Sequence, residues 1–423
     1  MSIEQPSRVA MVSMHTSPLD MPGSGDAGGL NVHLAETARR IAATGTAVDI
    51  FTRAGGQTGD RSGRLGDGVR VLPVGDENMR SLTKEQLPAQ ATDFASAMIA
   101  LSASDPQCSY DLVHSHYWIS GLAGLQAADE WSVPLVHTMH TLGHVKNRQL
   151  APGDHLEPQS RLDSERHLVA AADTLLANTE YERRDLIELY DADPNRIRVV
   201  PPGVDLELFR PGDKAKARYR TGLSPHRRVL LFVGRLQPLK APDVLIRAVH
   251  LMVEKQPQLR EELQLVLCGG ASGAAADYPS DLRRLAAELG VNDVVDFRGP
   301  LPANQLAELY RAADLVAVPS HSESFGLVAL EAQASGTPVV AAAVGGLTTS
   351  VADGRGGVLI PSHEPRIWAE TLATLLGQPR LLAEFAASGP RHAAAFDWQF
   401  TAAATMSAYR GARHRVPELQ AAH

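Results

Sequence analysis

The chain contains few cysteines and no long apolar run. Two cysteines among 423 residues, Cys108 and Cys268, cannot form a disulfide framework and indicate two reduced thiols. No apolar run reaches about 18 residues, the length that predicts a membrane-spanning helix. The N-terminus also lacks a basic segment followed by an apolar core, the pattern of a secretory signal peptide. These absences predict a cytoplasmic protein.

An excess of positive charge is also missing. The 40 Lys and Arg residues stand against 48 Asp and Glu residues, and the net charge of −8 argues against general binding to nucleic acids or anionic membranes. A local basic site for a phosphorylated small molecule remains open. Apolar residues (44%) and charged residues (21%) have the proportions of a globular protein, which excludes wholesale disorder.

Short apolar runs rich in Val, Ile and Leu alternate with longer segments of helical pattern. The predicted strands are Arg8–Met14, Ala47–Thr52, Leu112–His114, Leu135–Thr138, Val229–Val233, Leu263–Leu267, Val294–Phe297, Leu315–Val318 and Pro338–Ala342. The predicted helices are Leu30–Ala43, Leu87–Leu101, Pro242–Val253, Ser280–Glu288, Gln305–Arg311 and Gly326–Ala334. This alternation predicts an α/β fold with parallel sheets covered on both faces, as in doubly wound Rossmann-like domains.

The alternation breaks at Val199–Pro211, where adjacent prolines and a glycine indicate a linker. We therefore expect one Rossmann-like domain over residues 1–200 and a second over 201–395. The tail, residues 396–423, includes a predicted helix at Asp397–Arg413 that we expect to pack back across the domains. Two such domains form a cleft, and ligands bind at the carboxyl ends of the strands that face it.

A glycine-rich loop precedes the first predicted helix. Gly23–Gly28 matches the pattern G-x-G-x-x-G, and Arg53 could hold a 2′-phosphate, so an NAD(P) site is one alternative. However, eight residues separate this loop from the first strand, and Asp49 lies inside the second strand rather than at its end. We favour a loop whose Gly28–Gly29 backbone approaches a phosphate at the helix N-terminus.

Charged residues follow strands in the second half. Arg235 comes after Val229–Val233, and Lys240 five residues later; together they can clamp a diphosphate, although a solvated basic turn is the alternative. Glu323 follows another strand, and Glu331 is predicted about two turns into the next helix, where a carboxylate can accept two ribose hydroxyls. The alternative for Glu331 is an exposed helical glutamate. Two further glycine-rich turns follow strands: Gly269–Gly273 and Val344–Gly346.

Five blocks of the chain resemble the family 4 retaining glycosyltransferases of the GT-B fold, in particular the members that act on inositol phosphate in mycothiol biosynthesis. The blocks are SMHTSPLDMPGSGDAGGLNV, DLVHSHYWISG, PLVHTMHT, VGRLQPLKAPDVL and VPSHSESFGLVALEAQASGTPVVAAAVGGL. The likeness covers roughly residues 8–400. The resemblance implies transfer of N-acetylglucosamine from UDP-N-acetylglucosamine to 1D-myo-inositol 3-phosphate with retention of the anomeric configuration. A homodimer is a further expectation from the family.

The resemblance also implies the site residues. Those matching donor-binding positions are Met21, Pro22, Gly29, Arg235, Lys240, Leu301, Glu323 and Glu331. Those matching acceptor-binding positions are His15, Asp26, Ala27, Gly28, Gly29, Leu30, Asn31, Lys84, Tyr117, Thr141 and Arg161. Independently of the resemblance, Lys84, Tyr117, Thr141 and Arg161 offer two cations and two hydroxyls, a sufficient set for a phosphate monoester.

The resemblance implies a catalytic group of His140, Arg235, Lys240 and Glu323, with His140 beside the reacting sugar as an orienting hydrogen-bonding group. The pair of flanking carboxylates that glycosidases use is not part of this pattern. Instead, the acceptor hydroxyl approaches from the side on which UDP departs, and a phosphate oxygen takes its proton. Catalysis then depends on positioning and on stabilisation of the leaving group.

Two metal sites are conceivable. The dense histidines His114, His116, His137, His140 and His144 would suit zinc only with about four converging ligands, so we favour a sugar cleft at these positions. Members of the family are described with a structural magnesium held by main-chain oxygens. The matching positions are Tyr310, Arg311, Ala313 and Thr337. No cofactor is required for the chemistry.

The chain departs from the family pattern at the edges of the cleft. Met21 stands where glutamine is usual, His33 where tyrosine is common, and Gly75–Arg80 where the family usually has GPYEG. These differences leave open a related glycosyltransferase with another acceptor or nucleotide sugar. A non-catalytic nucleotide-sugar-binding protein is a more distant alternative, because it would be expected to lose His140, Glu323 or the Arg235–Lys240 pair.

Overall fold

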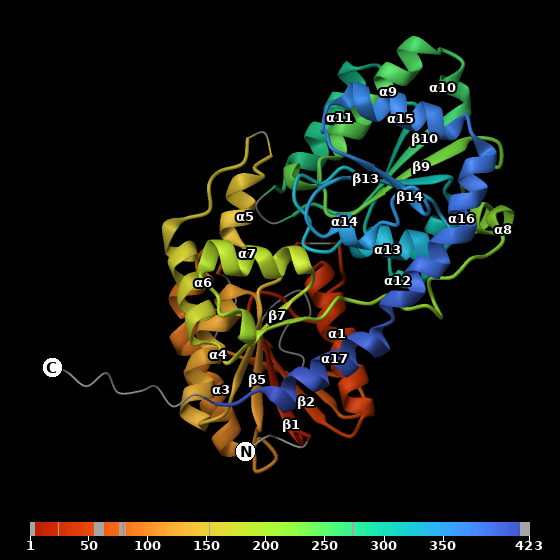
Figure 1. Ribbon diagram of the computed structural model, residues 1–423. Helices are drawn as coiled ribbons and strands as arrows, with labels where there is room; N and C mark the ends of the chain where they lie inside the picture. Colours follow the sequence, from red (N-terminus) through yellow and green to blue (C-terminus); the bar gives the residue numbers. More distant parts are fainter. Residues whose placement is uncertain are drawn as a thin grey trace.

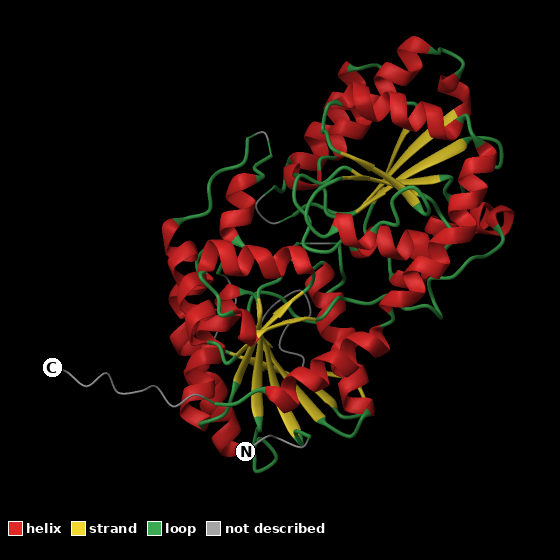
Figure 2. Ribbon diagram, in the orientation of Figure 1, coloured by secondary structure: helices red, strands yellow, loops and turns green. Residues whose placement is uncertain are grey.

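The computed structural model describes residues 5–23, 25–54, 63–75, 79, 82–151, 153–272 and 275–414. Each half of the chain forms a central sheet with helices on both faces, and the two halves lie side by side (Figure 1; Figure 2). This is the expected α/β architecture of two Rossmann-like domains. No described helix is long and apolar enough to cross a membrane, and both cysteines are buried and free.

The sheet of the N-terminal domain has eight strands in the order β3-β4-β2-β1-β5-β6-β7-β8, parallel except at the β3 edge. The strands are β1 (Arg8–Ser13), β2 (Ala47–Arg53), β3 (Gly63–Gly66), β4 (Val69–Val74), β5 (Leu112–His116), β6 (Leu135–Thr138), β7 (Thr174–Ala177) and β8 (Ile197–Val199). The helices are α1 (Gly29–Ala43), η1 (Leu87–Gln90), α3 (Ala91–Ser104), α4 (Trp118–Trp131), α5 (Gly143–Arg148), α6 (Gln159–Ala171), α7 (Glu180–Tyr190) and η2 (Pro194–Arg196).

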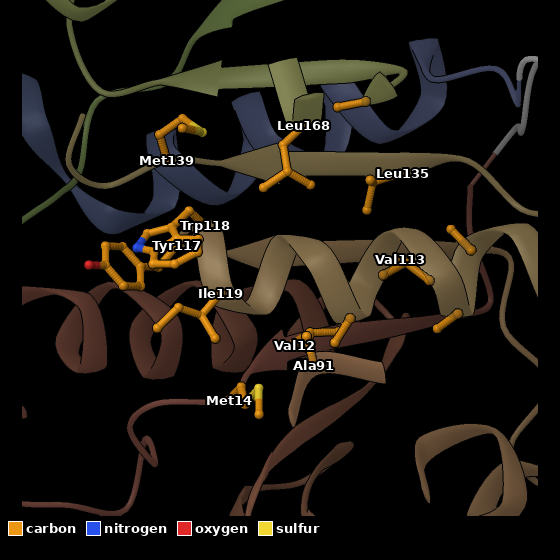
Figure 3. Close-up of a cluster of buried hydrophobic side chains, with 14 of the residues drawn as sticks. Val12, Met14, Ala91, Val113, Tyr117, Trp118, Ile119, Leu135, Met139 and Leu168 are labelled. Carbon is orange, nitrogen blue, oxygen red and sulfur yellow. The ribbon is translucent and has the colours of Figure 1, made fainter. Parts of the chain in front are cut away.

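Strand β1 shows why this sheet is covered on both faces. Ala10 and Val12 point into a core formed with α3, α4, α6 and α7, whereas Val9 and Met11 point into a core formed with α1 and the C-terminal helix. The first core is drawn in Figure 3, where Tyr117 lies at its end with the hydroxyl pointing away from the other labelled side chains. A side chain predicted to bind the acceptor is thus anchored by the core.

The C-terminal domain has a six-stranded parallel sheet in the order β11-β10-β9-β12-β13-β14. Its strands are β9 (Arg228–Val233), β10 (Leu263–Cys268), β11 (Val295–Arg298), β12 (Leu315–Val318), β13 (Val339–Ala342) and β14 (Gly357–Ile360). Its helices are α8 (Lys214–Thr221), η3 (Pro238–Lys240), α9 (Pro242–Lys255), α10 (Leu259–Glu262), α11 (Tyr278–Glu288), α12 (Ala303–Ala312), α13 (Leu327–Ala334), α14 (Leu347–Ser350), α15 (Pro365–Leu376), α16 (Pro379–Ala393) and η4 (Ala394–Phe396).

The chain crosses between the domains twice, and the two crossings lie against each other. Val204 N donates to Phe396 O at 2.7 Å, and a Cβ on Gly203 would lie 2.4 Å from the backbone nitrogen of Trp398. Only glycine permits this approach at position 203. Beyond the second crossing, α17 (Trp398–Gly411) packs on α1 and inserts Tyr409 into the N-terminal core (Figure 1). The tail therefore fastens the C-terminal domain to the N-terminal one.

Candidate active site

A cavity of about 1230 Å³ lies between the domains and is lined by loops that follow strands of both sheets. It is larger than a typical pocket for one small molecule, which is about 300–1,000 Å³. At one place the two walls meet, because Gly270 N donates to Gly23 O at 2.9 Å. Of the residues predicted to bind ligands, those that line the cavity are His15, Pro22, Asp26, Gly28, Gly29, Leu30, Lys84, Tyr117, His140, Thr141, Arg161, Arg235, Lys240, Leu301, Glu323 and Glu331.

Three of the residues predicted to bind the donor or the acceptor do not line the cavity. Met21 is exposed, and Ala27 is buried. Asn31 accepts a hydrogen bond from Gly28 N at 2.9 Å and donates to Thr16 Oγ1 at 2.7 Å. Its side chain therefore holds the glycine-rich loop in shape instead of reaching a ligand.

The glycine-rich loop lies close to the opposite wall. A Cβ on Gly28 would be 3.6 Å from Arg235 Nε, and one on Gly29 would be 3.4 Å from Leu327. The loop backbone can thus reach a ligand that Arg235 contacts. The NAD(P) alternative is not supported, because Asp49 is buried in an ion pair with Arg70 and Arg53 donates to the main chain of Leu82.

Arg235 and Lys240 supply positive charge to the C-terminal wall. Lys240 Nζ lies 2.5 Å from Glu323 Oε2, while Arg235 Nη1 donates to Ser272 Oγ at 3.3 Å. Burial lowers the pKa of Arg235, although Asp26 and Glu323 oppose this effect. The guanidinium therefore lies in a poorly solvated position, where an anionic ligand interacts strongly with it.

The predicted turn Val344–Gly346 positions Glu323. Gly346 N donates to Glu323 O at 2.8 Å, and a Cβ on Gly345 would lie 2.3 Å from that same oxygen. Gly345 also has a φ of +45°, in the region that glycine adopts without strain. Both Lys240 and Ser320 contact Glu323 Oε2, so Oε1 is the oxygen left for a ligand.

Glu331 lies on the same wall of the cavity. Helix α13 begins at Leu327, so Glu331 is one turn into it and not two, because Gly326 takes the left-handed conformation and caps the helix. Tyr310 Oη donates to Glu331 Oε2 at 2.8 Å. Burial raises the pKa of Glu331 to about 7, a shift that the Tyr310 hydrogen bond partly opposes. This carboxyl therefore titrates near neutral pH.

On the N-terminal wall, Lys84 and Arg161 flank Tyr117. Lys84 Nζ lies 4.7 Å and Arg161 Cζ 5.3 Å from the centre of the Tyr117 ring, and the His15 ring packs against it at 4.6 Å. Burial alone would raise the pKa of Tyr117, but the charges of Lys84 and Arg161 outweigh burial and lower it. Positive φ values at Tyr117 (+74°) and His140 (+59°) show that both strand ends are locally strained.

Arg161 is held by two carboxylates that the sequence reasoning missed. Its guanidinium, 3% exposed, lies 2.7 Å from Glu165 Oε1 and 2.9 Å from Glu157 Oε2, and it donates to Thr141 Oγ1 at 3.1 Å. Glu157 also pairs with Lys146, a further cation at the cavity. The spacing of four residues between Glu157, Arg161 and Glu165 was the available signal.

The dense histidines do not form a metal centre in the described part of the chain. His114 bonds Tyr409 Oη at 2.7 Å and Thr138 Oγ1 at 2.9 Å, while His137 bonds Ser115 Oγ at 2.7 Å. His116 Nδ1 lies 2.9 Å from His140 Nε2. Each of these four rings thus has at least one nitrogen bonded to a protein partner, and only His140 of the four lines the cavity.

The expected magnesium positions lie outside the cavity lining. The Tyr310 carbonyl already accepts hydrogen bonds from Thr337 Oγ1 at 2.7 Å and from Ala313 N at 3.1 Å. Both lone pairs of this carbonyl oxygen therefore accept hydrogen bonds, and a cation bound there would have to displace at least one of these hydrogen bonds. The magnesium site therefore stays a prediction, with its Tyr310 position already hydrogen-bonded to protein.

Two family models match the chain. The Glycosyl transferase 4-like domain matches residues 28–203, and Glycosyl transferases group 1 matches residues 213–392, so the crossover lies between them. D-inositol 3-phosphate glycosyltransferase 2 of Catenulispora acidiphila is 52% identical over 404 residues, which are 96% of this chain and 95% of the relative. D-inositol 3-phosphate glycosyltransferase of Kribbella flavida is 52% identical over 405 residues, 96% of each chain.

Solved structures agree on the fold. Sucrose-phosphate synthase from Thermosynechococcus elongatus has a TM-score of 0.86 at 30% identity over 96% of this chain and 98% of its own. Anabaena Alr3699/HepE in complex with UDP and glucose has a TM-score of 0.74 at 22% identity over 95% of this chain and 99% of its own, a likeness of fold alone. Two Rossmann-like domains around one cleft, with these matches, define a GT-B glycosyltransferase. Within that class, the chain belongs to the D-inositol 3-phosphate glycosyltransferase family.

Proposed function

We propose that this chain transfers N-acetylglucosamine from UDP-N-acetylglucosamine to 1D-myo-inositol 3-phosphate and retains the anomeric configuration. The observation that carries the proposal is a single cavity with cations on both walls, Arg235 and Lys240 on one and Lys84 and Arg161 on the other. Two phosphorylated substrates that react with each other need two such groups. The names of the 52% identical relatives support inositol 3-phosphate as the acceptor.

On the donor side, Arg235 and Lys240 would bind the diphosphate, and the Gly29 backbone would approach it from the other domain. Glu331 would accept hydrogen bonds from the ribose hydroxyls, with the main chain at Leu301 beside the uracil. The free Oε1 of Glu323 suits a hydroxyl of the donor sugar. Glu323 would thus orient both the sugar and Lys240.

On the acceptor side, Lys84, Tyr117, Thr141 and Arg161 would bind the phosphate monoester. Arg161 has five N–H donors, and its two carboxylates and Thr141 leave some of them available. His15 and the loop at Asp26–Leu30 would contact the cyclitol ring. This arrangement favours a phosphorylated polyol over a neutral one.

The chemistry follows from the charges that develop. As the bond to UDP breaks, negative charge grows on the diphosphate, and Arg235 and Lys240 stabilise it; one such group can contribute about 3–4 kcal/mol. The acceptor hydroxyl attacks from the same face, and a diphosphate oxygen takes its proton. Binding both substrates in one cavity also lowers the activation barrier, because the reacting groups are already oriented toward each other.

Release of UDP from UDP-N-acetylglucosamine tests this function, measured with inositol 3-phosphate, with unphosphorylated inositol and with no acceptor. We expect release that depends on inositol 3-phosphate, and a product whose NMR coupling shows the anomeric configuration of the donor. No acceptor-dependent release would refute the proposed acceptor. Release with another phosphorylated polyol, or with another nucleotide sugar, would indicate the related glycosyltransferase instead, while donor binding without turnover would indicate a non-catalytic protein.

A further inference from the structure

His116 lies directly behind His140 and bonds to it. His116 ends β5 and His140 follows β6, and the two rings meet through His116 Nδ1 and His140 Nε2 at 2.9 Å. His140 lines the cavity, whereas His116 is fully buried. The second ring nitrogen of His140, Nδ1, bonds no described residue and is the nitrogen left for a ligand.

Each of these two rings is neutral at neutral pH. Burial lowers the pKa of both His116 and His140 well below the usual value, and neighbouring histidines lower it further. A neutral imidazole carries one N–H and one lone pair. Two arrangements are therefore open: His116 Nδ1–H donates to His140 Nε2, or His140 Nε2–H donates to His116 Nδ1.

The far side of His116 distinguishes the two arrangements. Its Nε2 is buried without a hydrogen-bond partner, and its ring is packed against His114 at 4.0 Å and His33 at 6.0 Å. If His116 Nδ1 were the acceptor, Nε2 would carry an unpaired buried N–H, which is rarer in folded proteins than an unpaired acceptor. Donation from His116 Nδ1–H leaves only a lone pair unpaired.

We propose that His116 is a positioning residue that sets the tautomer of His140, so that His140 Nδ1 carries the proton and its N–H donates a hydrogen bond to an oxygen of the bound sugar. His140 then orients its ligand and does not remove the proton of the acceptor hydroxyl, because its exposed nitrogen has no lone pair available. The identity of the ligand rests on the proposed function, whereas the tautomer does not.

The surroundings of the pair keep both rings fixed. His140 has a backbone φ of +59°, and His33 packs edge-on against its ring at 5.1 Å. Behind His33, Trp398 of α17 packs against it at 5.7 Å. The orientation of His140 is thus supported by the helix that returns from the second domain.

Nitrogen NMR tests the tautomer without any substrate. In long-range proton–nitrogen spectra of the ¹⁵N-histidine-labelled protein, protonated and bare ring nitrogens are well separated, and the His140 signals are those lost in His140→Gln. We expect a protonated Nδ1 and a bare Nε2 for His140. A protonated Nε2 would overturn the proposal, whether or not the protein turns over inositol 3-phosphate.

Activity tests the consequence. His116→Leu removes the donor and should lower kcat for UDP release about tenfold, roughly the effect of losing one oriented hydrogen bond. His116→Asn keeps an N–H donor close to the same place and should recover most of that loss. His137→Leu, a buried histidine on the neighbouring strand that does not line the cavity, is the matched control and should leave kcat unchanged. Equal kcat values for folded His116→Leu and the control would contradict the proposal.

Discussion

Arg235 and Arg161 are one cation from each wall of the cavity, and the protein holds them differently. Arg235 contacts a single neutral hydroxyl and makes no ion pair within 4.0 Å in the described residues. Arg161 is enclosed by two carboxylates and a threonine. Asp26 and Glu323 act on Arg235 without forming a close ion pair, so in the proposed reaction its charge stays available to a leaving group that gains negative charge. Arg161 gives up most of its net charge and provides fixed hydrogen-bond donors for an acceptor whose charge does not change.

This comparison predicts that Arg161→Ala damages the fold and Arg235→Ala damages only the reaction. Removing Arg161 leaves Glu165, which is fully buried, without its cation, so we expect a loss of about 3–5 kcal/mol in unfolding free energy. Urea unfolding measures it. Adding Glu165→Gln should recover part of the loss, since no buried charge is then unpaired. Unchanged stability in Arg161→Ala would mean that the ion pair is not buried in solution.

Arg235→Ala should lower kcat for UDP release by about 10²–10³, because the developing charge on the diphosphate loses its strongest partner. Urea unfolding should match the wild type within about 0.5 kcal/mol, since Arg235 makes no buried ion pair. Arg235→Lys is the matched control. Its kcat should lie between those of the wild type and Arg235→Ala, because the lysine ammonium keeps the positive charge but lacks the paired donors of the guanidinium. Normal turnover by Arg235→Ala would contradict the donor assignment.

Glu331 extends the comparison of the two walls to pH dependence. It lies on the wall where we propose that the donor binds, and its charge changes with pH. Its pKa is raised to about 7, so it is protonated below that pH and then accepts weaker hydrogen bonds from a ribose. The KM for UDP-N-acetylglucosamine should therefore rise about five- to tenfold as pH falls from about 8 to 6. Glu331→Gln should have a higher KM that is flat across this range. Identical pH profiles for both proteins would show that Glu331 does not bind the donor.

The C-terminal wall of the cavity, where we propose that the donor binds, could be predicted from sequence more fully than the N-terminal wall, where we propose that the acceptor binds. Arg235, Lys240 and Glu323 lie within short motifs that follow strongly apolar strands, so local pattern alone places them at one sheet edge. The N-terminal wall is assembled from distant segments: Lys84 and Arg161 flank the Tyr117 ring, yet they lie 33 and 44 positions away from it in the chain (117 − 84 and 161 − 117). No local spacing encodes those contacts.

Helix α4 shows why parts of the fold were missed. Gly121 and Gly124 lower its helical propensity, yet a Cβ at Gly121 would lie 2.6 Å from Leu168 and one at Gly124 would lie 2.8 Å from Ser115. Close packing of α4 therefore requires these glycines, and the same glycines make the helix hard to predict from sequence. Strand β4 was missed because it contains Pro73, a residue that argues against a strand. The sheet tolerates this proline because β4 lies next to the edge strand.

Glu157→Gln tests the acceptor wall with the smallest expected effect. Glu157 is partly exposed and pairs with both Lys146 and Arg161, so it occupies cations that a phosphate would need. If it competes with the acceptor, removing its charge should lower the KM for inositol 3-phosphate by roughly two- to fivefold, in keeping with about 0.5–1 kcal/mol for a partly exposed pair. If Glu157 instead holds Arg161 in position, the same KM should rise. The KM for the donor should not change in either case, because the Arg235 wall is untouched.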